Sequence, residues 1–172
     1  MSTSVHKFVL PNGVRVLCEP ISYVQSAAIG IWCQTGSRME SPTEAGISHL
    51  IEHMLFKGTE RRTAEQIAQD IEGRGGSMNA FTDREMTCYY ARVLADDIAN
   101  AVDVLADMFT HSKLAPDDLE LEKSVVQEEI RKYEDSPEDH IHDLHARMRW
   151  GNHPLGKPII GTHESVGRFK RE

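Results

Sequence analysis

Several features that would fix a class of protein directly are scarce or missing in the 172-residue sequence. Only three cysteines occur, Cys18, Cys33 and Cys88, and no two form a CxxC pair, so the sequence has neither a cysteine zinc cluster nor a dithiol redox motif. No apolar run reaches the roughly 18 residues that a membrane-spanning helix requires, and the first residues carry no secretory signal pattern. We therefore expect reduced thiols, a cytoplasmic location and no membrane partner.

Basic residues are also fewer than acidic ones. The sequence contains 19 Lys and Arg residues against 27 Asp and Glu residues, which gives a net charge of −8. Nucleic acids and anionic membrane surfaces attract basic proteins, so neither is an expected partner. Peptides with basic residues fit this charge better, and the hydrophobic share of 40% allows a single domain with one core.

Hydrophobic patterns and turn residues predict an α+β fold. Strand patterns occur in a hairpin around Pro11-Asn12-Gly13 (5–18), at 24–32, and in two neighbouring runs at 77–82 and 85–93. Helical spacing and capping signals occur at 44–58, 63–73, 96–109, 116–135 and 137–150. The expected architecture is a mixed, largely antiparallel sheet with helices packed on one face. The final segment, 151–172, shows no closing strand or helix.

The stretch GISHLIEHMLFKGT, residues 46–59, places two histidines and a glutamate in an otherwise apolar helix. At about 100° per residue, His49, Glu52 and His53 leave the helix on one side. Two imidazoles four residues apart can bind one Zn²⁺, which needs a third protein ligand in a catalytic site. Glu52 could accept a proton from water as a general base. Buried polar side chains need such a partner, although hydrogen-bonded or surface histidines are the alternative.

A third ligand has to come from another element, and the run ELEKSVVQEEIRKYE at 120–134 offers carboxylates. Glu122 and Glu129 are seven residues apart, which is about two helical turns, so both lie on one face of the predicted helix. The alternative is a solvated charged surface, which most such runs form. The spacing alone does not choose the ligand among these glutamates.

The motif HLIEH with the downstream EKSVVQEEI resembles the HxxEH zinc peptidases called inverzincins, the family of pitrilysin, insulin-degrading enzyme and the mitochondrial processing peptidase. LPNGVRVL, GSRMES, NAFTDREMTCYY and HPLGKPIIGT follow in the family's order, so the likeness extends over nearly the whole chain. In detail the chain is most similar to the shorter bacterial members related to the processing peptidases.

This resemblance implies a Zn²⁺ cofactor with His49, His53 and Glu129 as its ligands. It also implies that Glu52 is the general base and that Glu122 is a catalytic-site carboxylate supporting the metal ligands. Such support is physically expected, because a metal-bound imidazole usually donates its other N–H group to an acceptor.

The resemblance extends to substrate binding and to partners. Asn79, Ala80 and Phe81 match the family's edge strand, to which an extended substrate adds through main-chain hydrogen bonds. Family members enclose their substrate between homologous α+β domains, so residues 1–172 are expected to form an N-terminal zinc-carrying domain, truncated at its end and without the C-terminal half. That half, a partner subunit or a second copy in a homodimer would then close the chamber.

The resulting prediction is the N-terminal catalytic part of a zinc metalloendopeptidase that cuts oligopeptides or small unfolded polypeptides. The alternative is a non-catalytic peptide-binding or scaffold subunit of a two-part peptidase, since the family includes partners that lack the metal motif. The intact HxxEH motif favours the enzyme.

Overall fold

Residues 4–171 are described by a computed structural model in which three strands, two helices, two more strands and four helices follow one another along the chain. The strands are β1 (His6–Val9), β2 (Arg15–Cys18), β3 (Ser26–Cys33), β4 (Ser77–Thr82) and β5 (Thr87–Leu94). The helices are α1 (Ile47–Leu55), α2 (Ala64–Glu72), α3 (Ile98–His111), α4 (Pro116–Asp135), α5 (Pro137–Trp150) and α6 (His163–Arg168). Short 3₁₀ turns lie at Ser37–Met39, Ala95–Asp97 and Pro154–Gly156. None of the helices within 4–171 combines the length and the hydrophobicity that a membrane crossing needs.

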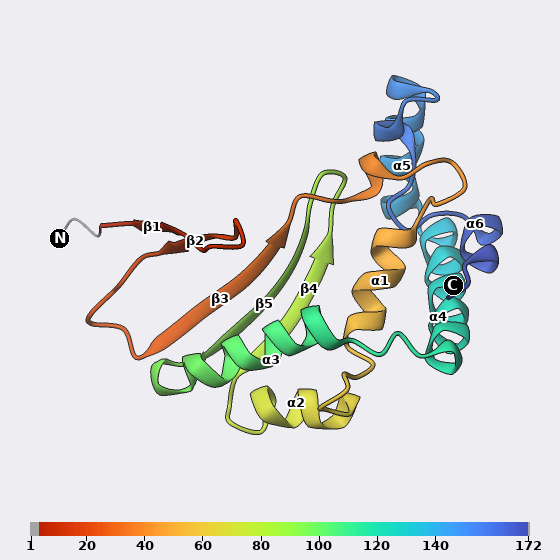
Figure 1. Cartoon of the computed structure of the whole chain (residues 1–172). Coiled ribbons are helices and arrows are strands. Elements are labelled where there is room, and N and C mark those ends of the chain that lie inside the picture. The colour runs from red at the N-terminus through yellow and green to blue at the C-terminus, as the bar shows by residue number, and fades with distance from the viewer. Residues whose placement is uncertain (1–3, 172) are drawn as a thin grey trace.

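The strands form two antiparallel units (Figure 1). β3, β5 and β4 lie side by side in that order, and both Ile31 and Ala80 are opposite Tyr89. β1 and β2 pair separately as a hairpin whose turn contains Gly13 at φ +88°, a value that favours glycine. Every described strand pair is antiparallel, and the predicted pairing of β4 with β5 is confirmed.

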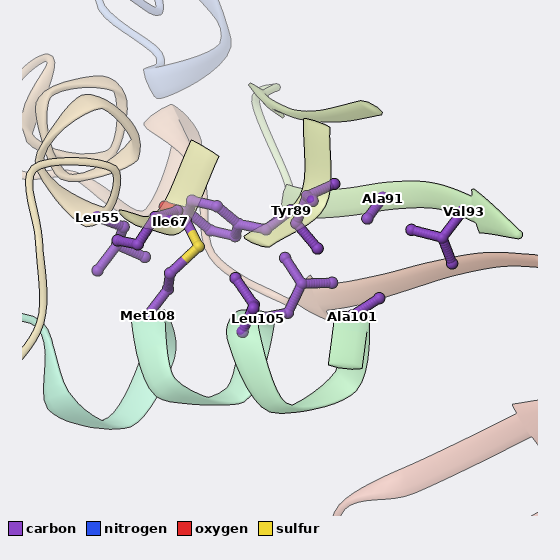
Figure 2. Packing of buried hydrophobic residues seen from close by; sticks show 10 residues of the cluster. Leu55, Ile67, Tyr89, Ala91, Val93, Ala101, Leu105 and Met108 are labelled. Atoms are coloured by element: carbon purple, nitrogen blue, oxygen red, sulfur yellow. The ribbon is translucent and has the colours of Figure 1, made fainter. Parts of the chain in front are cut away.

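One face of the three-stranded sheet packs against helices and forms the first core. Side chains alternate between the two faces of a strand, so Tyr89, Ala91 and Val93 of β5 point to the same side. Figure 2 shows them meeting α3, whose Ala101 and Leu105 are also buried. α2 covers the same face near β4. The predicted α+β class with helices on one face is therefore confirmed.

Helix α1 lies between this core and a second one. Leu55 belongs to the first core, whereas Leu50 and Met54 pack into the second together with Val126 of α4 and Val166 of α6. Full burial of one such side chain contributes roughly 1.5–3 kcal/mol. One side of α1 thus packs against the first core and another against the second. Its polar side chains lie on the remaining side.

The first helix is shorter than the predicted range of 44–58. α1 ends at Leu55, and the backbone N–H of Phe56 still bonds to the carbonyl of His53. Gly58 does adopt a left-handed conformation, at φ +124°, but its backbone pairs with Thr63 in an isolated β-bridge. The apolar pattern continues past the end of the helix because Phe56 packs against the first core.

The prediction that 151–172 contains no helix is wrong, because α6 occupies His163–Arg168. The Thr162 hydroxyl accepts a hydrogen bond from the backbone N–H of Ser165 (3.1 Å), and the Ser165 hydroxyl accepts one from that of Thr162 (3.0 Å). Val166 and Phe169 then complete the second core. Serine replaces the Glu or Gln of the usual capping box, and six residues are too few for a clear helical period.

Candidate metal site

The N-terminus of α1 is fixed by a buried carboxylate. Gly46 precedes the helix at φ +90°, a conformation that side chains rarely adopt. The Glu40 carboxylate accepts hydrogen bonds from the backbone N–H groups of Gly46 (2.7 Å) and Ser48 (2.9 Å). The first N–H groups of a helix lack partners within it, and a negative charge is favourable there. Glu40 therefore helps to set the helical register that places His49.

Two histidines of α1 and one glutamate of α4 converge on a small region. The Nε2 atoms of His49 and His53 lie 3.8 Å and 3.6 Å from the same Glu129 carboxylate oxygen. The two imidazole rings are 4.7 Å apart between centroids. The α1–α4 contact brings these side chains together, and within residues 4–171 they form the one group of three metal-ligating side chains at this spacing.

The geometry and the donor types fit a zinc ion. Ligands about 2.0–2.2 Å from a tetrahedral zinc lie roughly 3.3–3.6 Å from one another, close to the distances to Glu129. Burial, together with the charge of His53, lowers the pKa of His49 to about 4. The His49 imidazole is therefore neutral at pH 7, and the neutral imidazole is the form that binds metal.

A second glutamate of α4, Glu122, contacts His53 and Lys57. The Oε2 atom of Glu122 lies 3.1 Å from Nδ1 of His53, and Oε1 lies 2.6 Å from Nζ of Lys57. Only 4% of the Glu122 side chain is exposed, so these contacts take the place of water. As the seven-residue spacing predicts, Glu122 and Glu129 both face α1. His49 differs from His53, because its buried Nδ1 atom has no hydrogen-bond partner within residues 4–171.

Glu52 lies beside the histidines and is held by the neighbouring strand. The hydroxyl of Thr82, at the end of β4, donates a hydrogen bond of 2.5 Å to the Glu52 carboxylate. Burial raises the pKa of Glu52, although the bond from Thr82 and the proximity of His53 oppose the rise. A half-buried carboxyl group with a raised pKa is suited to general acid–base chemistry near neutral pH.

A shallow cavity of about 280 Å³ extends from His53 to the edge strand β4. Its lining consists of Glu52, His53, Phe56, Lys57, Asn79 and Glu122. β4 is an edge strand of the described sheet. The Asn79 side-chain oxygen accepts a hydrogen bond from the backbone N–H of Ala80 (2.8 Å), and Phe81 is 39% exposed. The predicted substrate-binding residues thus border the site, and of these three only Ala80 packs against the first core.

A larger cavity of about 410 Å³ lies along α5 and away from these side chains. It includes His142 and His145, which belong to no group of three metal-ligating side chains within residues 4–171. The smaller cavity beside His53 is the one next to the candidate metal-binding residues. The larger volume of the α5 cavity is therefore not evidence of a functional site.

Sequence reasoning missed four residues that shape the site, namely Glu40, Phe56, Lys57 and Thr82. Each acts through a contact with an element distant in the sequence or through backbone geometry. Lys57 follows His53 by four residues, one helical turn, but it lies beyond the end of α1. Because helical spacing does not extend past the end of α1, no local signal identifies this lysine.

Two imidazoles and one carboxylate form a ligand set that is found at the catalytic zinc sites of peptidases. A family model described as insulinase, peptidase family M16, matches residues 15–163. The chain therefore belongs to this family, and the resemblance inferred from the sequence motifs is confirmed.

Individual relatives agree with this assignment. The uncharacterized zinc protease YmxG of Bacillus subtilis is 50% identical over 165 residues, which cover 96% of this chain and 40% of that protein. An uncharacterized zinc protease of Mycobacterium leprae is 48% identical over 170 residues, covering 99% of this chain and 38% of its own length. The chain thus spans about 40% of the length of these relatives.

Solved structures share the fold. A protease from Helicobacter pylori superimposes with a TM-score of 0.93 at 24% identity, over 98% of this chain and 41% of that one. Pitrilysin superimposes with a TM-score of 0.85 at 25% identity, over 96% of this chain and 18% of its own. These two matches support the α+β architecture.

Proposed function

We propose that this chain is the zinc-binding N-terminal part of a metalloendopeptidase. The observation that carries the proposal is the convergence of His49 and His53 on one oxygen of Glu129, at 3.8 Å and 3.6 Å. These distances are too long for hydrogen bonds and close to the spacing of ligands around one zinc ion. The names of the bacterial relatives, which are called zinc proteases, support the same metal.

In this proposal His49, His53 and Glu129 hold the zinc ion. When bound, zinc polarises a carbonyl group and lowers the pKa of water toward about 7. Glu52 accepts the proton of the attacking water and later returns it to the leaving amine. The hydrogen bond from Thr82 occupies one Glu52 oxygen and leaves the other free for the proton. Glu122 fixes the His53 ring through its Nδ1 atom.

The substrate that fits this arrangement is an extended oligopeptide or a segment of an unfolded polypeptide. Asn79, Ala80 and Phe81 lie on an edge strand that borders the cavity, where a peptide can add as a further strand. Such binding uses main-chain groups and therefore reads extension more than side-chain identity. We further propose that the part of the longer relatives outside the matched region, or a partner subunit, covers this edge and closes the site.

Metal content per chain tests the proposal. We expect about one zinc per wild-type chain after purification without chelator, and little in Glu129→Ala. Glu128→Ala is the matched control, because Glu128 is the adjacent glutamate, is 70% exposed and pairs with Arg131. Zinc absent from the wild type after incubation with excess metal, or unchanged in Glu129→Ala, contradicts the site.

A second variant separates the base from the ligands. Glu52→Gln should retain zinc as the wild type does, while any peptide hydrolysis measured with the wild type is lost. Loss of zinc in Glu52→Gln to the extent seen in His49→Ala would contradict the role given to Glu52. Peptide binding without zinc in the wild type would instead favour the scaffold subunit predicted as the alternative.

A further inference from the structure

We propose that Lys57 is a positioning residue of the metal site, acting on His53 through Glu122; this inference rests on the proposed function. The Nζ atom of Lys57 lies 2.6 Å from Oε1 of Glu122. The other carboxylate oxygen, Oε2, lies 3.1 Å from Nδ1 of His53. Each oxygen of Glu122 therefore has its own partner, and the three side chains form a short chain that ends at a predicted metal ligand.

Burial explains why Glu122 requires this second partner. Its side chain is 4% exposed, so water compensates little of the cost of an ionised carboxylate there. The Lys57 side chain is 33% exposed, so its ammonium group can reach both the carboxylate and solvent. Among the ion pairs of residues 4–171, those of Glu122 are with His53 and Lys57. Lys57 thus supplies the permanent charge that stabilises Glu122 inside the α1–α4 contact.

The contact with Lys57 also fixes how Glu122 is oriented. A carboxylate with a partner at one oxygen can turn about its terminal bond, whereas the hydrogen bond to His53 at one oxygen and the ion pair with Lys57 at the other together hold its plane. Because an ionised Glu122 can only accept a hydrogen bond, Nδ1 of His53 carries the proton in this contact. The other ring nitrogen, Nε2, then has a free lone pair and faces Glu129. Lys57 therefore selects the imidazole orientation that can bind a metal ion.

Positioning and simple charge predict opposite effects on zinc binding. A lysine that acted only as a nearby positive charge would repel Zn²⁺, so its removal would strengthen binding. A lysine that positions Glu122 has the reverse effect, because its removal frees the carboxylate and weakens the hold on His53. The direction of the change in affinity therefore distinguishes the two roles.

Competition with a chromophoric chelator measures the Zn²⁺ affinity of the purified chain at pH 7. We expect Lys57→Met to weaken binding about tenfold, the lower end of the effect of removing a hydrogen-bonded support of a metal ligand. Lys57→Arg keeps the charge and the donors and should bind within about threefold of the wild type. Lys123→Met is the matched control, since it removes a lysine of low exposure that pairs with Glu120 instead of Glu122.

A double-mutant cycle tests the route through Glu122. In a Glu122→Gln background, Lys57→Met should change the Zn²⁺ affinity little, because the carboxylate that Lys57 holds is gone. Unchanged or tighter binding in Lys57→Met, or an equal loss in both backgrounds, would overturn the inference. If circular dichroism finds Lys57→Met unfolded, Lys57→Gln takes its place and must weaken binding likewise. A wild type that binds no zinc refutes the proposed function, and this inference with it.

Discussion

Replacement of Asp107 by asparagine should destabilise the fold, because this buried carboxylate holds the segment that connects α1 and α2. Asp107 lies on α3 and is 1% exposed. Its Oδ2 atom accepts hydrogen bonds from the hydroxyl of Thr59 and the guanidinium of Arg62, both at 2.7 Å. Thr59 and Arg62 belong to the segment that joins α1 to α2, so this buried carboxylate ties that segment to α3.

The magnitude follows from these contacts. A hydrogen bond to a charged group is worth about 1.5–3 kcal/mol, and Asp107→Asn replaces two such bonds with weaker or mismatched ones. Arg62 keeps its ion pairs with Asp70 and Asp103, so its charge is not left without a partner. We expect a loss of about 3 kcal/mol in the free energy of unfolding. At about 2–4 °C per kcal/mol for a domain of this size, Tm should fall by about 6–12 °C.

Urea unfolding, followed by circular dichroism, measures this loss as a lower midpoint with an unchanged slope. Asp103→Asn is the control, because Asp103 pairs with the same arginine but its side chain is 47% exposed. Exposed ion pairs contribute about 0–1 kcal/mol, so the control should lose less than about 1 kcal/mol. A loss below about 1 kcal/mol in Asp107→Asn, or equal losses in both variants, would refute the reasoning.

Three further predictions concern Gly46, Thr82 and the pH dependence of stability. Gly46→Ala should lower the free energy of unfolding by more than about 2 kcal/mol in urea, because φ is +90° and a Cβ atom would lie 2.6 Å from a backbone oxygen. Thr82→Val should leave zinc content unchanged but slow peptide hydrolysis about tenfold in a preparation that cleaves peptides, with Thr82→Ser restoring it, because only the hydroxyl donates to Glu52. Burial raises the pKa of Asp107, but its threonine and arginine donors outweigh this and the net shift is downward. Its stabilisation is therefore complete above about pH 4 and is lost as the pH falls through the lower folded pKa; Asp107→Asn should flatten the fall in stability with decreasing pH. Equal slopes in an acid titration of the two chains would contradict this assignment.

The parts of the fold that sequence reasoning predicted are those with long regular patterns. The 20-residue helix α4 begins at a proline followed by two aspartates and carries repeated apolar residues, so its bounds were found from local signals. The Asn-Gly turn between β1 and β2 was equally clear. The seven-residue spacing of Glu122 and Glu129 placed both on one face of α4, and the structure brings that face against α1.

The parts that were missed depend on contacts that no local pattern records. α6 is only six residues long, and it is stabilised by the burial of Val166 against α1 and α4, which precede it in the sequence. Lys57 lies in irregular chain after α1, where helical spacing no longer predicts which direction a side chain takes. Its partner, Glu122, lies on α4. The ion pair therefore depends on the packing of α4 against α1, which no local pattern indicates.

The position of α1 between two cores links the chemistry of the site to separate parts of the fold. Leu50 and Met54 pack with α4, and this packing sets the distance from the histidines to Glu129. Leu55 packs on the sheet side instead, where β4 supplies the hydroxyl that holds Glu52. The proposed metal ligands therefore depend on the second core, and the proposed base, Glu52, depends on the first. A single helix that belongs to both cores keeps these groups in one fixed geometry, as the proposed catalysis by aligned groups requires.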